Sequence, residues 1–143
     1  LVSSSAASDV YKRQLIDDSL VRGTTCHKII KMLYEAGANE VHVRIACPQI
    51  KFPDFYGVDM PTKEELLAHG KNINEMTKHI KATSLKFLSL DGLYLALVGE
   101  KRNVIYPQFS DHYFTGDYPI KPSDKLKGLK VKQLSLLSGK SNN

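Results

Sequence analysis

The amino-acid sequence predicts an α/β fold built on a parallel β-sheet, and three consecutive features carry this prediction. An apolar strand end, Leu15–Ile16, stands before a helical pattern that begins near Thr24. The segment "EVHVRIA", Glu40–Ala46, then alternates apolar and polar residues, which is typical of a half-buried strand. Strand, helix and strand within about 30 residues form a βαβ unit, whose two strands run parallel.

The helix of this unit has recognisable start and stop signals. Thr24 or Thr25 is the expected N-cap, because a threonine oxygen can accept a hydrogen bond from a free N–H of the first turn. Gly37 is expected to end the helix in a left-handed conformation. The predicted apolar face consists of Ile29, Ile30, Leu33 and Ala36.

Four further elements are expected after the βαβ unit. "TKEE", Thr62–Glu65, has the form of a capping box and predicts a short helix that ends before Gly70. "NINE", Asn72–Glu75, predicts a second capping box, followed by an apolar stripe of Ile73, Met76 and Ile80. "SLKFLSL", 84–90, is strand-like, and "LDGLYLALVG", 90–99, predicts a short helix that closes near its final glycine.

Composition limits the possible classes of protein. The chain has 143 residues, enough for one domain with its own core. The formal net charge of +5 is concentrated at the ends, since Leu15–Pro119 has 12 Lys or Arg against 13 Asp or Glu. We therefore expect no nucleic-acid-binding face, and no apolar run is long enough to predict a membrane span. Cys26 and Cys47 have no metal-binding spacing, which favours reduced thiols and a cytoplasmic location.

The two ends of the chain read differently from its middle. Residues 1–14, "LVSSSAASDVYKRQ", have neither an initiator methionine nor the apolar region of a signal peptide, and we interpret them as a non-native, adaptor-derived segment. Polar Tyr11–Gln14 stands where a buried strand should be apolar, so the first strand is expected to be cut short. Residues 120–143 are rich in lysine and are expected to form a flexible tail. The predicted domain is therefore 15–119.

An acidic pair and a glycine turn are the strongest candidates for a binding site. Asp17 and Asp18 follow a strand end, where parallel sheets bind ligands, and adjacent carboxylates are best tolerated beside a divalent cation or sugar hydroxyls. In the loop Ser19–Thr25, Gly23 permits a positive φ, and the first free N–H groups of the helix attract an anion.

Together these residues predict a site for a phosphorylated ribose, with its hydroxyls near the carboxylates and its phosphate at the glycine turn. The hydroxyls of Thr24 and Thr25 would add donors, while Arg22 either pairs with the phosphate or points to solvent. An ordinary helix start is the competing interpretation of each feature taken alone. The chain has no Gly-x-Gly-x-x-Gly and no Gly-Lys-Ser/Thr, so dinucleotide-binding and Walker-type sites are not indicated.

At these residues the chain resembles a known family. "LIDDSLVRGTT", 15–25, resembles the signature with which type I phosphoribosyltransferases bind phosphoribosyl pyrophosphate (PRPP). The similarity continues with the amidophosphoribosyltransferase family in three later segments, at 32–70, 84–97 ("SLKFLSLDGLYLAL") and 114–119 ("FTGDYP"). The resemblance therefore covers 15 to about 119.

The resemblance implies a truncated type I phosphoribosyltransferase fold, a parallel sheet with flanking helices, followed by C-terminal helices. The parent enzyme would transfer glutamine-derived ammonia to PRPP, giving 5-phosphoribosylamine and pyrophosphate in the first committed step of purine synthesis. Asp17 and Asp18 match the positions that handle Mg²⁺ and the ribose hydroxyls, and Ser19–Thr25 match the 5′-phosphate loop, which purine nucleotides also use. The glutaminase domain would lie before Leu15, so this chain alone is expected to be inactive, and the full-length enzyme is expected to be a homo-oligomer.

Some family members carry an iron–sulfur cluster, and the resemblance implies that this chain does not. At the ligand positions it has Asp54, and Pro107, Ser110 and Tyr113 in the second region, so no cluster is expected. Surface or capping roles are expected for the histidines, which are His27, His42, His69, His79 and His112.

Two alternatives stay open at this point. A non-catalytic module that senses PRPP or nucleotides would share the same fold and loop. A response-regulator receiver domain would also place an acidic pair before an amphipathic helix, but Asp59 lies only two residues before Pro61 and follows no apolar strand.

Overall fold

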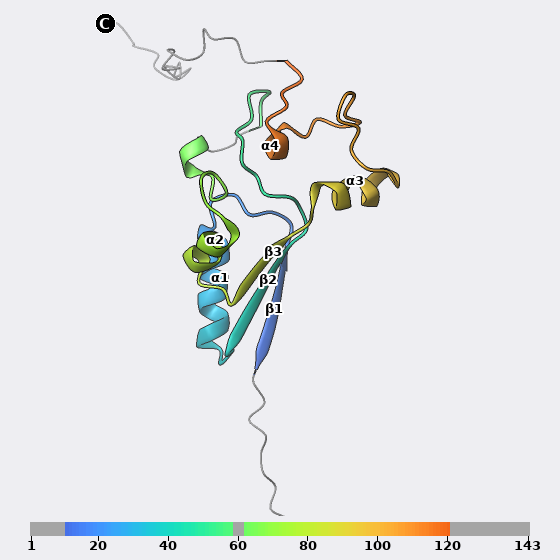
Figure 1. The fold of residues 1–143 in the computed structure, drawn as a ribbon. Coiled ribbons are helices and arrows are strands. Elements are labelled where there is room, and N and C mark those ends of the chain that lie inside the picture. The colour runs from blue at the N-terminus through green and yellow to red at the C-terminus, as the bar shows by residue number, and fades with distance from the viewer. Residues whose placement is uncertain (1–10, 59–61, 121–143) are drawn as a thin grey trace, which may run out of the picture.

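The computed structural model describes residues 11–58 and 62–120, so the expectations for 1–10 and 121–143 lie outside the described residues. Figure 1 shows the order of the elements along the chain. They are β1 (Lys12–Asp17), α1 (Thr24–Glu35), β2 (Glu40–Ile45), a 3₁₀ turn (Lys63–Glu65), α2 (Ile73–Ile80), β3 (Ser84–Phe87), α3 (Leu90–Val98) and α4 (His112–Thr115).

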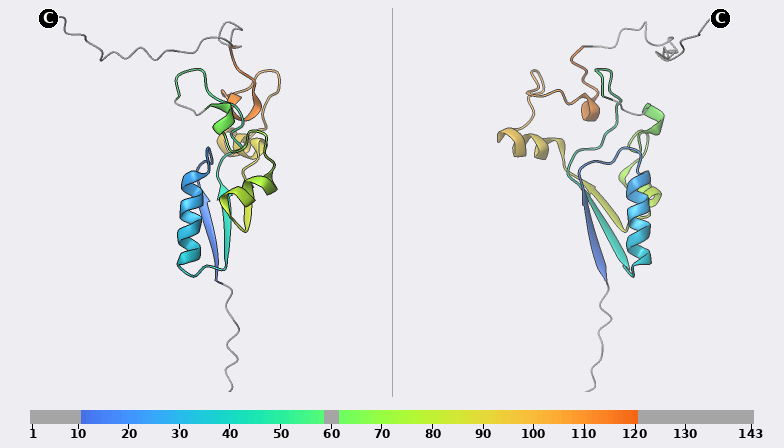
Figure 2. Two further views of the ribbon diagram at one scale, coloured as in Figure 1. Left: turned by 90° about the vertical axis from the view of Figure 1, so that its left-hand side faces the viewer. Right: turned by 180° about the vertical axis from the view of Figure 1, so that it is seen from behind.

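The three strands form one parallel sheet in the order β1-β2-β3, which confirms the predicted α/β class. In its register, Val43 of β2 lies between Leu15 of β1 and Leu85 of β3. Helices α1 and α2 both lie against the same face of this sheet, as Figures 1 and 2 show. The core fills the space between that face and the two helices.

The strands and helices contribute to this core where the apolar patterns predict it. Val41, Val43 and Ile45 point from β2 into the core, and the stripe of α2 is buried through Met76 and Ile80. Asn72 caps α2 as expected: its side chain accepts from the N–H of Glu75, and the carboxylate of Glu75 accepts from the N–H of Asn72. Helix α3 and its closing glycine are also confirmed.

Strand β1 is longer than the apolar pattern predicts. It begins at Lys12, three residues before Leu15, and Lys12, Arg13 and Gln14 pair with β2 although their side chains are exposed. Strand pairing uses backbone groups, so it does not require apolar side chains where the strand is uncovered. The expectation of a strand cut short at Leu15 is therefore wrong.

One prediction about the start of α1 and one about its buried face are also wrong. Gly23, not a threonine, is the N-cap of α1, because its positive φ of 78° makes the turn and leaves Thr24 as the first helical residue. The buried face of α1 includes Cys26 in place of Ala36, which is exposed, whereas Gly37 ends the helix with a positive φ as expected.

The expected helix at Thr62–Glu65 is only one 3₁₀ turn, and Thr62 makes no side-chain cap. The chain becomes extended at Leu66, and Leu66–Ala68 are buried. The segment ends its turn early because these apolar residues enter the core.

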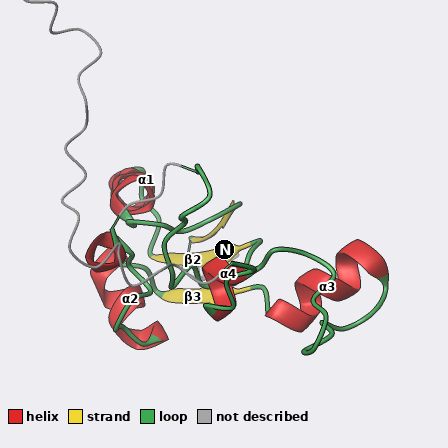
Figure 3. Ribbon diagram, turned by 90° about the horizontal axis from the view of Figure 1, so that it is seen from above, coloured by secondary structure: helices red, strands yellow, loops and turns green. Residues whose placement is uncertain are grey.

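Helices α3 and α4 lie beyond the carboxyl ends of the strands, and α3 extends away from the sheet (Figure 3). None of the helices in the described part of the chain combines the length and the apolar character needed to cross a lipid bilayer.

Candidate functional site

The carboxyl end of β1 opens into a small cavity formed by the loop that leads to α1. Asp17 is the last residue of β1, and a cavity of about 220 Å³ is lined by this residue and by 19–26. The sequence-predicted residues Asp17, Ser19, Arg22, Gly23, Thr24 and Thr25 all line it. Asp18 lies between Asp17 and Ser19 and is exposed.

The core holds the glycine turn of this loop in place. Gly23 is buried, and a Cβ atom added there would meet Leu67 Cδ2 at 2.8 Å and Ile80 Cγ2 at 3.2 Å. The N–H of Leu67 also donates to the carbonyl oxygen of Val21 at 2.8 Å. The loop is therefore braced by segments far along the chain, and sequence reasoning missed Leu67 and Ile80 because nothing local connects them with Gly23.

The first N–H groups of α1 are available to a ligand. Within the described residues, the N–H groups of Thr24, Thr25 and Cys26 have no acceptor, whereas that of His27 bonds to the carbonyl oxygen of Gly23 at 2.9 Å. The threonine side chains are exposed beside them. Free amides at the positive end of a helix dipole are a favourable site for an anion such as a phosphate.

Other protein groups occupy only part of the hydrogen-bonding capacity of the acidic pair, Asp17 and Asp18. Asp17 Oδ1 accepts from the N–H of Asp18 at 3.0 Å, and Asp18 Oδ1 accepts from the hydroxyl of Ser19 at 2.9 Å. In the described part of the chain neither carboxylate forms an ion pair. One oxygen of each carboxylate is thus left for a ligand.

These oxygens have the chemistry that suits a hydrated magnesium ion. Carboxylate oxygens are the ligands that Mg²⁺ prefers, and this ion keeps several waters or phosphate oxygens around it. No group of three or more His, Cys, Asp or Glu that could hold a metal by itself occurs among the described residues. Asp17 and Asp18 therefore fit a shared cation rather than a closed protein cage.

Arg22 makes an exposed ion pair, with its Nη2 3.1 Å from Oε2 of Glu65. Both side chains are about half exposed, so this pair contributes little to stability. Both interpretations offered by the sequence remain predictions for Arg22.

Cys26 lies under the loop as a neutral thiol. It is 2% exposed, and burial, together with the negative charge of Asp17, raises its pKa to about 11. The thiol therefore adds no negative charge beside the free amides of the first turn.

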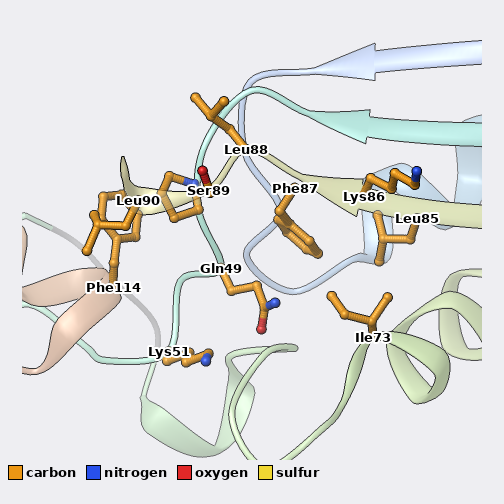
Figure 4. A pocket seen from close by; sticks show the side chains of 11 residues that line it. Gln49, Lys51, Ile73, Leu85, Lys86, Phe87, Leu88, Ser89, Leu90 and Phe114 are labelled. Carbon is orange, nitrogen blue, oxygen red and sulfur yellow. The ribbon is translucent and has the colours of Figure 1, made fainter. Parts of the chain in front are cut away.

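A larger cavity of about 580 Å³ lies beyond the carboxyl end of β3 (Figure 4). Apolar side chains such as Phe87, Ile73 and Phe114 form much of its wall, and Gln49 and Lys51 reach it from the loop after β2. It is wide and mostly apolar, whereas the smaller cavity at Gly23 gathers carboxylates, hydroxyls and free amides. Chemistry rather than size therefore identifies the candidate site.

A polar cluster around His112 includes Asp54 and Ser110, two of the residues that the resemblance compares with iron–sulfur ligands. His112 Nε2 lies 2.8 Å from Asp54 Oδ1, and His112 Nδ1 lies 3.0 Å from the hydroxyl oxygen of Ser110. His112 is 2% exposed, so the expected surface or capping role is wrong for this histidine. The cluster joins the loop after β2 to α4.

The parallel α/β chain is similar in sequence and in structure to known amidophosphoribosyltransferases. No family model matches the chain. Its sequence is 54% identical over 125 residues to an amidophosphoribosyltransferase of Rhizobium etli, covering 87% of this chain and 25% of the relative. It is 44% identical over 132 residues to that of Staphylococcus epidermidis, covering 90% of this chain and 26% of the relative.

Solved structures give the same result. Glutamine PRPP amidotransferase from B. subtilis, in complex with ADP and GMP, superposes with a TM-score of 0.69 at 42% identity, over 78% of this chain and 24% of that chain. A structure of the allosteric regulatory enzyme of purine biosynthesis gives a TM-score of 0.63 at 41% identity, with the same coverage. The chain is thus a homologue of the amidophosphoribosyltransferases, and it spans about a quarter of the length of the curated relatives it matches.

Proposed function

We propose that this chain supplies the ribose- and 5′-phosphate-binding part of a PRPP site in an amidophosphoribosyltransferase. The observation that carries the proposal is the loop at the carboxyl end of β1. One end of this short segment carries carboxylate oxygens of Asp17 and Asp18 that accept no hydrogen bond, and the other end carries the free N–H groups of Thr24–Cys26. The homology to amidophosphoribosyltransferases supports the same assignment.

The role of each group follows from its chemistry. The N–H groups of the first turn and the hydroxyls of Thr24 and Thr25 hold the 5′-phosphate, each bond being worth roughly 1.5–3 kcal/mol. The carboxylates of Asp17 and Asp18 orient the ribose hydroxyls and stabilise positive charge that develops on the sugar ring. Mg²⁺, when bound, makes pyrophosphate a better leaving group, and Asp17 and Asp18 are the residues that would contact it.

The whole enzyme would take the ammonia from glutamine in a part that this chain does not include, and would act as a cytoplasmic homo-oligomer that also binds purine nucleotides. The nucleotide complex of the B. subtilis enzyme supports the last point. We propose no catalytic residue and no activity for this chain alone, because most of a relative lies outside the matched quarter. We propose no iron–sulfur cluster, because Asp54 stands at the first ligand position and no cysteine stands in the second ligand region, which contains Ser110 and Tyr113.

A chimera tests the proposal. Residues 15–119 of this chain replace the matching segment of the Rhizobium etli enzyme, and the pair Asp17→Asn and Asp18→Asn is introduced. The KM for PRPP should rise at least about tenfold, since losing one charged hydrogen bond of 1.4 kcal/mol or more has this effect. Glutaminase activity should be unchanged.

Asp91→Asn is the matched control, because Asp91 is an exposed carboxylate on α3, away from the loop. PRPP kinetics that respond equally to both changes, or to neither, would reject the assignment. If the chimera binds PRPP but forms no phosphoribosylamine, the sensing module is the better description.

A further inference from the structure

A buried histidine connects a buried carboxylate with an exposed hydroxyl at the start of α4. His112 Nε2 lies 2.8 Å from Asp54 Oδ1, and His112 Nδ1 lies 3.0 Å from Ser110 Oγ. The side chains of His112 and Asp54 are 2% and 0% exposed, whereas Ser110 is exposed. A nucleophile beside a base, with a third group that orients the base, is the arrangement that activates a hydroxyl.

The positions of the protons in this cluster follow from the charge of Asp54. Its Oδ2 accepts from the backbone N–H groups of Tyr56 and Val58 at 2.8 and 2.7 Å. Burial would raise the pKa of this carboxyl, but these hydrogen bonds and that from His112 outweigh it and lower the pKa to about 2. An ionised carboxylate only accepts, so His112 Nε2 carries a proton and donates it to Asp54. In the neutral imidazole Nδ1 is then the acceptor, and the hydroxyl of Ser110 is its donor.

Aromatic side chains hold the imidazole of His112 in this orientation. The ring centroid of Tyr113 lies 4.0 Å from that of His112, and those of Tyr56 and Tyr118 lie 5.1 Å from it. The hydroxyl of Tyr118 also donates to the carbonyl oxygen of Pro53 at 2.8 Å, which joins the segment after α4 to the loop after β2 (Figure 1). The base is therefore in place before any reagent arrives, so no reorganisation is needed at the moment of reaction.

A cavity of about 460 Å³ lies beside Ser110 and has room for a small ester. Ser110 lines it together with apolar side chains such as Val104, Ile105 and Phe109. Asp111 and Asp117 line its polar side, and Arg102 Nη2 donates to both, at 3.2 and 2.7 Å. Two carboxylates that share one guanidinium leave an excess of negative charge. The cavity therefore favours an uncharged reagent with an apolar body over an anionic one.

We propose that Ser110 is a modification site that accepts an acyl group from an uncharged, activated ester or thioester. Ser110 Oγ forms a bond to the carbonyl carbon of the reagent. The bond from that carbon to the leaving oxygen or sulfur breaks, and its electron pair goes with the leaving atom. The hydroxyl proton passes to His112 Nδ1 and from there to the leaving group, so the imidazole ends neutral. The negative charge of Asp54 stabilises the imidazolium in between.

The product of this step is one acyl ester on each chain. It needs neither PRPP nor the loop that carries Asp17 and Asp18, so it stands apart from the proposed function. Loss of PRPP binding through Asp17→Asn and Asp18→Asn should leave the acylation of Ser110 unchanged.

A second serine with partners of the same kind shows what distinguishes Ser110. Ser84 Oγ lies 2.8 Å from His42 Nδ1, and His42 Nε2 lies 2.9 Å from Glu40 Oε2. The side chains of His42 and Glu40 are 26% and 30% exposed, so water screens the charge that would stabilise an imidazolium. Arg44 Nη1 also donates to Ser84 Oγ at 3.1 Å and occupies a lone pair that would be needed for attack. Burial of the base and its carboxylate, rather than the bond to histidine alone, therefore singles out Ser110.

The uncharged ester p-nitrophenyl butyrate tests the proposal. The full chain is incubated with it near neutral pH, and the butyryl group is located by mass spectrometry of peptides. Ser110 should be acylated at least about tenfold faster than Ser84, since a positioned general base contributes this much or more. An unlabelled Ser110, or equal rates at the two serines, overturns the proposal.

Single substitutions assign the parts of the cluster. Ser110→Ala should remove the label, and Ser84→Ala is the matched control that should leave it in place. Asp54→Asn should slow the acylation of Ser110 at least about tenfold, measured against that of the exposed Lys101 in the same sample. Circular dichroism checks that each variant is folded, and an undiminished rate in Asp54→Asn overturns the proposal.

Ser110→Cys gives a readout that a purely structural role of Asp54 would not change. A thiol beside His112 should form a thiolate–imidazolium pair. Its alkylation by iodoacetamide should therefore slow less than that of glutathione as the pH is lowered from neutral. Adding Asp54→Asn should restore the steeper dependence of glutathione. A thiol that follows glutathione already without Asp54→Asn would show that His112 does not act as a base, and would overturn the proposal.

Discussion

The backbone of Gly23 and the side chain of Leu67 lie so close that a Cβ atom at position 23 would come to 2.8 Å from Leu67 Cδ2. Leu67 is 3% exposed, and its N–H bonds to the carbonyl oxygen of Val21, so it cannot withdraw without disturbing the core. The loop that carries the free amides is thus held in shape by core packing.

Gly23→Ala should therefore lower the free energy of unfolding by about 1–3 kcal/mol. Alanine is strained at a φ of 78°, and its methyl group would collide with Leu67. Urea denaturation of the full chain, followed by circular dichroism, measures the loss.

Gly37→Ala provides the comparison for this prediction. Gly37 also has a positive φ, of 95°, but an added Cβ atom would meet nothing within 4 Å. Gly37→Ala should therefore lower the free energy of unfolding only through backbone strain. Equal losses at both positions would show that the contact with Leu67 is unimportant.

The two predicted capping boxes offer a second test, because only one of them forms. Asn72→Ala should destabilise the chain by about 1 kcal/mol, the usual effect of losing an N-cap. Thr62→Ala should change stability by less than about 0.5 kcal/mol, since Thr62 makes no side-chain cap. Thermal or urea unfolding of the two variants side by side would decide this, and a larger loss at Thr62 would contradict the structure.

Elements that bury one face were predictable from the pattern of their own residues. Strand β2 and helix α2 were predictable, because burial on one face leaves an alternating pattern in the former and a helical stripe in the latter. The exposed half of β1 was not, because a strand with uncovered side chains carries no apolar pattern. The N-cap at Gly23 was missed because threonine is the commoner capping residue, and only the backbone dihedral angle decides between them.

The residue types of the candidate loop, 17–25, were predictable from the sequence, but the contacts that support the loop were not. Leu67 reaches Gly23 from a distant segment, and His112 meets Asp54 across 58 residues of chain. Such contacts depend on tertiary packing. The spacing of histidines along the sequence therefore gave no indication that one of them is buried.

Asp54 should make the stability of the chain depend on acid pH. Burial would raise the pKa of this carboxyl, but hydrogen bonds from the backbone N–H groups of Val58 and Tyr56 and from His112 outweigh it and lower the pKa to about 2. The ordinary value in the unfolded chain is 3.8. The stabilising contribution of Asp54 is therefore complete above about pH 4 and is lost as the pH falls through about 2.

Asp54→Asn tests this dependence, because the amide has no proton to gain in this range. The free energy of unfolding, measured with urea, should fall less steeply for the variant than for the unchanged chain as the pH is lowered from about 4 to about 2. Parallel pH profiles would mean that the carboxyl titrates alike in the folded and unfolded states. Asp91→Asn, at an exposed carboxyl, should leave the steep profile in place.

Cys26 should give the opposite pH dependence, at the alkaline end. Burial and the charge of Asp17 raise its pKa from 9.0 to about 11, so the folded state keeps the proton after the unfolded state has released it. The contribution of the thiol to stability is thus complete below about pH 9 and is lost as the pH rises through about 11.

Cys26→Ala should lower stability by a constant amount below about pH 9, through lost packing, and the gap to the unchanged chain should narrow above it. A gap that stays constant up to about pH 11, measured by urea unfolding, would show that the thiol ionises equally easily in both states. In that case a thiolate would form beside the positive end of α1 above about pH 9, and only in that alkaline range would it compete with a bound anion for the free amides.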